Sequence, residues 1–229
     1  MKDILPDEVI SDISEHLIDG CAHGEEGWES GEDEEDTLTG DLGGSLRRKW
    51  TTVSTQSGDW KWRMTYKKFR GRGKGAEEKH IGADGIVEIE IEKANGEGET
   101  KGILFQSKKV TSKGKEKLLE QLRDMEELVP KGSALIEFGP KEYKGFESTE
   151  VITADGKIGT IDNNGNNRLG SFLAEKFLPC EVGARGLYYE APRKTLIIPN
   201  QTKGFTRIKA KLKHRFRIEV KQKSSSSMN

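Results

Sequence analysis

Three segments of the chain alternate between apolar and polar positions, the pattern of strands with one buried face. In residues 59–69 the tryptophans, a methionine and a tyrosine share one parity, and residues 86–92 read IVEIEIE. The longest alternation covers 206–220, with apolar side chains and one histidine on one face and mainly lysine and arginine on the other. We therefore expect strands over these three ranges.

Other strands are predicted from short apolar runs bounded by turn residues. The run GILFQSK at 102–108 follows a polar turn at 95–99, and SALIEF at 133–138 follows a Pro-Lys-Gly sequence. Shorter strands are expected over 150–155, 187–191 and 194–199.

Apolar residues at helical spacing predict four helices, over 5–18, 33–50, 115–129 and 168–180. The acidic, glycine-rich stretch 22–36 is expected to be mostly loop. From residue 33 to 138 the predicted order is helix, strand, strand, strand, helix, strand. That order indicates an α/β fold with a mixed sheet, in which a three-strand meander is followed by a right-handed crossover.

This order divides the chain into four parts. Residues 1–32 form an acidic N-terminal helix and loop, and 33–139 form the α/β core. Residues 140–222 are expected to be a β-rich α+β extension with a basic strand, and the serine-rich stretch 223–229 a disordered tail.

The net charge of −1 hides a strong segregation of charge. Residues 1–36 hold fourteen Asp or Glu and one lysine, whereas 203–223 hold nine Lys or Arg and one glutamate. A second basic run covers 66–75. Segregated charge favours a polyanion or another subunit as partner, and the alternative is two solvated faces of opposite sign.

No apolar run reaches the roughly 18 residues of a membrane span, and the acidic N-terminus does not resemble a signal peptide. The two cysteines lie far apart in the sequence, which does not favour a disulfide framework. We expect a cytoplasmic protein with no membrane partner.

Polar side chains lie at the start of one predicted strand and within the next. Gln106 and Lys108 are two residues apart and share one strand face, and Asp84 precedes the strand at 86–92. If the turn at 95–99 joins the two strands as a hairpin, Asp84 lies near both. A lysine buried beside a carboxylate is costly unless a site uses it.

The helix predicted over 33–50 adds a carboxylate. Its leucines span about 80° of the helix circumference, and Glu35 falls inside that stripe at about 60°. Asp36 faces away, and Glu34 is the alternative helix carboxylate.

Glu35 on a helix, Asp84 on a strand and Gln106-x-Lys108 on the next strand resemble the PD-(D/E)XK nuclease superfamily over residues 33–138. The sequence GADGI…ILFQSKK is similar to the Gln-x-Lys branch that includes Mrr-like restriction nucleases. The stretch EEDTLTGDLGGSLRRKW…TYKKFRGRGKGAEEKHIGADGI resembles nuclease effector subunits of bacterial anti-phage defence of the CBASS and Lamassu types. Gln106 replaces the commoner acid and is a weaker ligand, so the number of metals stays open.

The resemblance implies a restriction-endonuclease-like core and a metal-dependent DNA endonuclease. Asp84, Gln106 and Glu35 would hold Mg²⁺ or Mn²⁺, and the four catalytic residues would be Glu35, Asp84, Gln106 and Lys108. Lys108 would orient or deprotonate the attacking water and stabilise the phosphate.

Basic residues of the run 66–75 and of the basic face of 206–220, together with Lys109, are candidates for DNA contact. They are Lys67, Lys68, Arg70, Arg72, Lys74, Lys109, Lys211, Lys213 and Arg215. Implied protein partners are an SMC-like ATPase or sensor subunit of a defence complex, and a second copy of the chain in the active state. The alternatives are a non-catalytic nucleic-acid-binding subunit on a degenerate nuclease fold, and an RNA nuclease.

Two further positions have simple structural interpretations. His214 lies on the apolar face of the 206–220 strand and is expected in the core. Glu88 and Glu90 are expected on the solvent-exposed face of their strand. The alternative for Glu88 is a position beside the site, because it has the same parity as Asp84.

Overall fold

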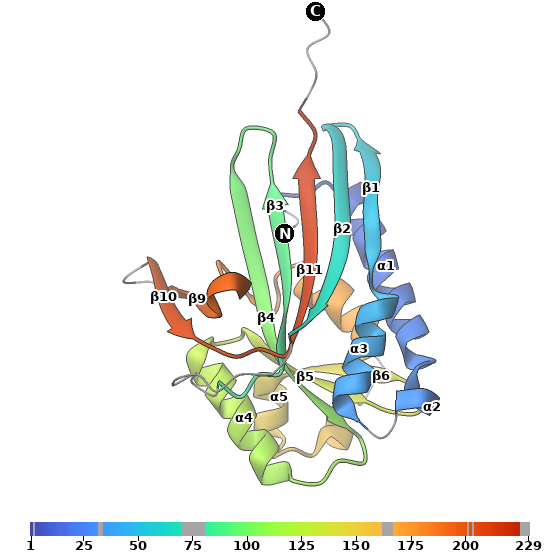
Figure 1. Ribbon diagram of the computed structural model, residues 1–229, viewed down its shortest axis with the longest axis vertical. Helices are drawn as coiled ribbons and strands as arrows, with labels where there is room; N and C mark the ends of the chain where they lie inside the picture. Colours follow the sequence, from blue (N-terminus) through green and yellow to red (C-terminus); the bar gives the residue numbers. More distant parts are fainter. Residues whose placement is uncertain are drawn as a thin grey trace, which may run out of the picture.

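A computed structural model describes residues 1, 3–31, 34–69, 81–161, 167–200, 202 and 204–224 (Figure 1). Its central sheet is mixed and has the strand order β1-β2-β11-β3-β4-β5-β6, with β7 paired to β4. The strands are β1 (Arg48–Thr55), β2 (Gly58–Lys68), β3 (Gly85–Glu92), β4 (Gly98–Lys109), β5 (Ser133–Phe138), β6 (Tyr143–Glu147), β7 (Ala184–Arg185) and β11 (His214–Gln222).

The predicted hairpin and crossover are present. β3 and β4 pair antiparallel around the turn at 93–97, and α4 (Lys115–Leu128) connects β4 to the parallel strand β5. The protein is therefore α/β with a mixed sheet flanked by helices, as its periodicity predicts.

The C-terminal strand occupies an unexpected place. β11 lies between β2 and β3, parallel to β3 and antiparallel to β2 (Figure 1). The three strands predicted before α4 are therefore not a continuous meander, and the central sheet takes strands from both sides of residue 139. The alternation of β11 suits this position, because its even-numbered residues from His214 to Val220 are all buried.

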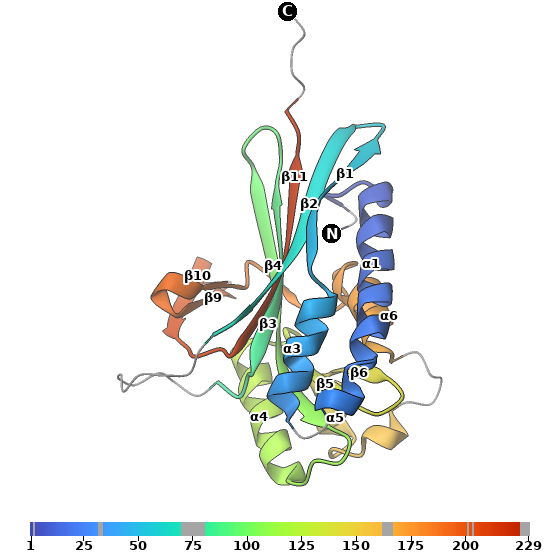
Figure 2. The ribbon, with the colours of Figure 1, turned by 45° about the vertical axis from the view of Figure 1, so that its right-hand side comes forward.

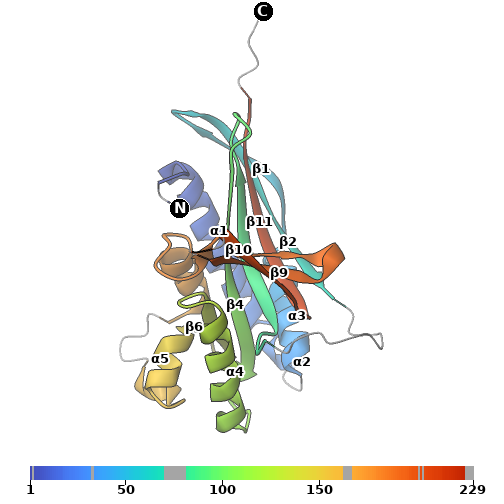
Figure 3. The ribbon, with the colours of Figure 1, turned by 90° about the vertical axis from the view of Figure 1, so that its left-hand side faces the viewer.

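Helices cover both faces of the sheet. On one face, α1 (Asp7–Glu25) and α3 (Glu35–Ser45) lie side by side (Figure 2). Their buried leucines and isoleucines pack on residues of β2, β3 and β11. On the other face, α4 lies beside α5 (Ser148–Thr153) and packs on the opposite parity of β3, β4 and β5 (Figure 3).

The remaining elements are short. A second sheet has the order β10-β9-β8. The elements are α2 (Trp28–Gly31), α6 (Leu169–Ser171), β8 (Tyr188–Glu190), β9 (Thr195–Asn200), β10 (Gly204–Lys209), the π-helix η2 (Phe172–Phe177), and the 3₁₀ turns η1 (Ile158–Thr160) and η3 (Ala191–Arg193).

Several sequence predictions are wrong in detail. Residues 150–155 are not a strand: α5 begins at Ser148, where Glu147 and Glu150 form a capping box. The range 206–220 is two strands, β10 and β11, which belong to different sheets.

The N-terminal predictions also need correction. The helix expected over 33–50 ends at Ser45, and β1 begins at Arg48. The loop expected over 22–36 is partly helical, because α1 continues to Glu25 and α2 follows it. Residue 33 and most of the tail expected at 223–229 fall outside the described residues.

Within the described part of the chain, no helix has the length and apolar character needed to cross a bilayer.

A fully buried lysine lies in β4. Lys101 is 0% exposed, its Nζ donates a hydrogen bond to the Phe177 carbonyl oxygen, and the same atom lies 4.3 Å from the centre of the Phe177 ring. Burial lowers the pKa of Lys101 to about 8. The charged form of this side chain therefore destabilises the folded state at neutral pH.

We predict that Lys101→Met raises the free energy of unfolding at pH 7 by about 1–3 kcal/mol. The gain shrinks as the pH rises from about 8 towards 10.5, because lysine then loses its proton in the unfolded chain as well. Urea unfolding between pH 7 and 10.5 measures it. Lys117→Met, at an exposed position of α4, is the control and changes stability by less than about 0.5 kcal/mol. A loss of stability in Lys101→Met at pH 7 contradicts the prediction.

Candidate active site at the strand ends

The candidate residues meet where four strands begin or end. β2 ends at Lys68, β4 ends at Lys109, β11 begins at His214 and β3 begins immediately after Asp84. The register places Gly85 opposite Phe105 on one side and His214 on the other, and places His214 opposite Lys68. Figure 1 shows β2, β11 and β3 converging at this edge.

The backbone of Asp84 is held from both sides. Its N–H donates to the Phe105 carbonyl oxygen over 2.8 Å. Its carbonyl oxygen accepts from the backbone N–H groups of Lys213 (2.8 Å) and His214 (3.1 Å). Asp84 is only 7% exposed, so its position is fixed by β4 and β11 together.

The Asp84 carboxylate gathers four donors. Oδ2 accepts from Gln106 Nε2 (2.5 Å), the Ser107 backbone N–H (3.1 Å) and Ser107 Oγ (2.9 Å). Oδ1 lies 2.7 Å from Lys213 Nζ. The expected closeness of Asp84 and Gln106 is therefore confirmed, and Ser107 and Lys213 join them.

Glu35 reaches the end of β4, as its place on the helix predicts. Its Oε2 lies 3.2 Å from Lys108 Nζ, and its Oε1 accepts from the Lys109 backbone N–H (3.2 Å) and from Ser112 Oγ (2.6 Å). Glu34 is the N-cap residue of α3. The ammonium on the Asp84 carboxylate is thus that of Lys213, and Lys108 pairs with Glu35.

Asp36 does not face away from the sheet. Its Oδ1 lies 2.8 Å from His214 Nε2, and its Oδ2 forms an ion pair with Lys68. Tyr66 OH lies 2.8 Å from His214 Nδ1. His214 is 1% exposed, as expected of a core residue, and burial lowers its pKa although Asp36 and Asp84 oppose this effect.

Each acid of the cluster therefore has one lysine partner: Glu35 with Lys108, Asp84 with Lys213, and Asp36 with Lys68. Partial burial alone would lower the pKa of Lys213, but Asp84, Asp36 and Glu35 raise it above its usual value. The three pairs form one electrostatic unit. From the sequence, Lys213 is predicted only as a basic residue of the 206–220 strand and a candidate for DNA contact, and Ser107 is not identified.

The basic candidates have different surroundings. Lys67 and Lys211 are exposed, and Lys109 is partly buried at the end of β4. Arg70, Arg72 and Lys74 lie outside the described residues. Lys68 and Lys213 already hold acids of the cluster.

Arg215 does not present a free cation. Its guanidinium Nη2 lies 2.6 Å from Glu88 Oε2, and Glu88 Oε1 accepts from the Tyr189 backbone N–H (2.6 Å). Glu88 is 3% exposed, so its assignment to a solvent-exposed face is wrong. The cause is the parallel pairing of β11, which places its basic row beside the acidic row of β3. The further pairs are Arg217 with Glu90 and Lys221 with Glu92.

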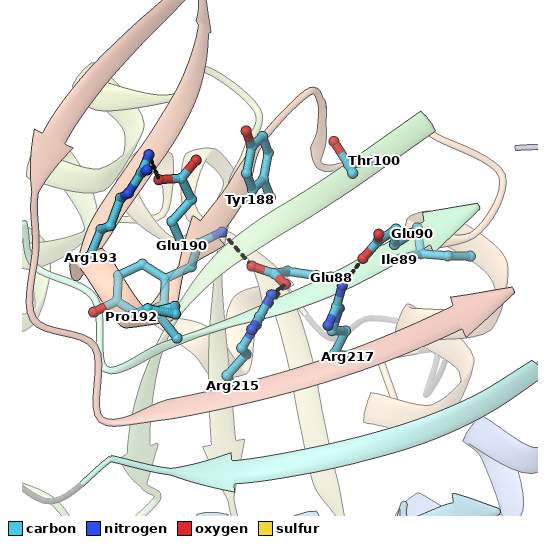
Figure 4. Close-up of a pocket in the computed structure, with 12 residues that line it drawn as sticks. Glu88, Ile89, Glu90, Thr100, Tyr188, Glu190, Pro192, Arg193, Arg215 and Arg217 are labelled. Carbon is cyan, nitrogen blue, oxygen red and sulfur yellow. Dashed lines mark hydrogen bonds and ion pairs between the residues drawn. The ribbon is translucent and has the colours of Figure 1, made fainter. Parts of the chain in front are cut away.

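A pocket of about 670 Å³ lies along this charged face, bordered by β3, β11 and the segment 188–193 (Figure 4). Three glutamates and three arginines line it, and they are paired as Glu88–Arg215, Glu90–Arg217 and Glu190–Arg193. Because its charges compensate one another, this pocket does not present a surplus of either sign.

The oxygen atoms of Asp84 and Gln106 are ligands of the kind that a hard divalent cation takes. Gln106 Oε1 is buried and has no hydrogen-bond partner within the described chain, and it belongs to the amide that contacts Asp84. Asp84, Gln106 and Glu35 offer only oxygen ligands, the kind that Mg²⁺ prefers. Among described residues, no three His, Cys, Asp or Glu side chains form a metal-binding group. Mg²⁺ often uses only one or two carboxylates and keeps several waters.

Comparisons with protein-family models, with curated proteins and with solved structures find no match for this chain. The chemistry of the strand-end cluster is therefore the basis on which a function can be proposed.

We predict that Arg215 contributes to stability and not to DNA affinity. Arg215→Met leaves the buried Glu88 carboxylate without its cation and lowers the free energy of unfolding by about 3 kcal/mol in urea titrations. The double variant Arg215→Met/Glu88→Leu recovers most of the loss. Lys221→Met, which breaks an exposed pair of the same strands, is the control and changes stability by less than about 0.5 kcal/mol. Unchanged stability of Arg215→Met, together with weaker DNA binding, would contradict this prediction.

Proposed function

We propose that this protein is a metal-dependent endonuclease that hydrolyses phosphodiester bonds of double-stranded DNA on a PD-(D/E)XK-like core. The observation that carries the proposal is the meeting of Glu35, Asp84, Gln106 and Lys108 at one sheet edge. These residues come from a helix and two neighbouring strands, and a metal-dependent active site would account for their concentration there.

The local topology supports the same proposal. β3 and β4 form an antiparallel hairpin, with Asp84 at the beginning of the first strand and Gln106-x-Lys108 near the end of the second. The crossover through α4 to β5 follows directly. This hairpin and crossover agree with what the resemblance implies, whereas β11 separates β2 from β3 and β1 is a further strand.

Asp84 and Gln106 would hold Mg²⁺ or Mn²⁺, with Glu35 beside them. A bound divalent cation supplies Lewis-acid chemistry, lowering the pKa of a coordinated water and offsetting charge on the phosphate. Ser107 donates two hydrogen bonds to Asp84 Oδ2 and so fixes the orientation of this carboxylate.

Lys108 is the residue that would act on the attacking water and the phosphate. Its ammonium is held by Glu35, and Glu35 is itself fixed by Ser112 Oγ and the Lys109 backbone N–H. An ammonium held in this way stabilises the charge that develops on a phosphate in the transition state.

The surrounding lysines suit a polyanionic substrate. Lys67, Lys68, Lys109, Lys211 and Lys213 lie at or close to the strand ends that carry the site. Cutting both strands of a duplex calls for two active sites, so we also propose a homodimer in the active state. An SMC-like ATPase or sensor subunit of a defence complex is the proposed regulatory partner.

One observation favours a second candidate function, that of a non-catalytic nucleic-acid-binding subunit. Every acid of the cluster already has a lysine partner, so the charges are balanced without a metal. An RNA nuclease is the remaining alternative, and parallel assays on RNA and DNA separate it from the main proposal.

We predict that the protein nicks or cuts duplex DNA in Mg²⁺ or Mn²⁺, and that Asp84→Asn and Lys108→Met each lower the rate at least about a hundredfold. Gel assays on supercoiled and linear DNA measure the rate. Asp59→Asn, an exposed aspartate at the other end of β2, is the matched control and retains activity. Equal cleavage by wild type, Asp84→Asn and Lys108→Met contradicts the site assignment. Salt-dependent DNA binding without divalent-cation binding supports the non-catalytic subunit instead.

A further inference from the structure

Lys213, which the family resemblance does not include, lies against the proposed metal ligand. Its Nζ is 2.7 Å from Asp84 Oδ1. An ammonium at this distance neutralises the same carboxylate that a divalent cation would use, and it repels a cation that approaches the same oxygens. Lys213 and the metal therefore compete for one position.

Backbone hydrogen bonds keep Lys213 beside Asp84 even when its side chain moves away from the carboxylate. The N–H groups of Lys213 and His214 both donate to the Asp84 carbonyl oxygen. The Lys213 side chain itself is 61% exposed and has a flexible four-carbon stem. An ammonium displaced from Asp84 thus stays within reach of any group that binds at Asp84.

The other two lysines of the cluster are less free to move. Lys108 has a less exposed side chain, and its partner Glu35 is anchored by two further hydrogen bonds. Lys68 pairs with Asp36, which also contacts the buried His214. Of the three pairs, the one that includes Lys213 has the most exposed lysine, and its acid, Asp84, is the proposed metal ligand that contacts Gln106.

We propose that Lys213 is a substrate-binding residue whose partner changes with the metal. In the metal-free protein it neutralises Asp84. When a divalent cation holds Asp84, the Lys213 ammonium moves to a phosphate of the DNA backbone. This inference rests on the proposed function and adds an exchange of ionic partners to it.

Calorimetric titration with Mn²⁺ tests the competition. Lys213→Met is expected to bind Mn²⁺ about fivefold more tightly than wild type, because no ammonium has to be displaced. Lys213→Arg restores the wild-type affinity, since it restores the competing charge. Lys223→Met is the matched control: it breaks an exposed lysine–aspartate pair at the opposite end of β2 and β11 and leaves Mn²⁺ affinity unchanged.

The movement of the Lys213 ammonium to a DNA phosphate is tested by measuring the affinity for duplex DNA with and without Ca²⁺ as the divalent ion. With Ca²⁺, Lys213→Met binds DNA more weakly than wild type, and the slope of log affinity against log salt falls by about one. Without a divalent ion, the two proteins bind equally, because the wild-type ammonium is then engaged by Asp84.

The outcomes separate this inference from the proposed function. Wild-type protein that binds Mn²⁺ no less tightly than Lys213→Met overturns the exchange alone, as does an equal loss of DNA affinity with and without Ca²⁺. Absence of Mn²⁺ binding in wild type and in all variants overturns both the exchange and the proposed metal-dependent activity.

Discussion

The parallel pairing of β11 with β3 is the interaction on which the candidate site depends. It places His214 opposite Gly85 and brings the Lys213 and His214 backbone N–H groups onto the Asp84 carbonyl oxygen. The same strand pairs with β2 and so brings Lys68 to the same edge. Residues separated by more than a hundred positions in the chain become neighbours because one C-terminal strand lies in the middle of the sheet.

This arrangement also determines the electrostatics of the molecule. The acidic row of β3 lies beside the basic row of β11, so three cations of β11 are paired with glutamates of β3 inside the protein. Buried charges need such partners, because the desolvation of an unpaired ion is costly. In the part of the chain that the structure describes, a largely exposed lysine holds a buried acid only at the strand ends, where Lys213 pairs with Asp84, and this is the pair for which we propose an exchange.

The sequence predicts local features well and long-range pairing poorly. The heptad-like leucines of α4 and the alternation of β3 identify these elements, and the hairpin they imply brings Asp84 to Gln106. The position of β11 leaves no such signal, since its alternation suits any half-buried strand. Lys213 could therefore be recognised as basic but not as the partner of Asp84. The prediction of a strand at the position of the short helix α5 is wrong, because its β-branched residues favour a strand locally whereas the capping box of Glu147 and Glu150 starts a helix.

We propose that Asp84 and Gln106 form a divalent-cation site from which Lys213 is displaced. Anomalous diffraction from crystals grown with Mn²⁺ tests it most directly. We expect an anomalous peak bonded to an Asp84 carboxylate oxygen and to the Gln106 amide oxygen, with the Lys213 ammonium moved away. Crystals in which Mn²⁺ is absent from these oxygens at saturating concentration, with Lys213 still on Asp84, would contradict it.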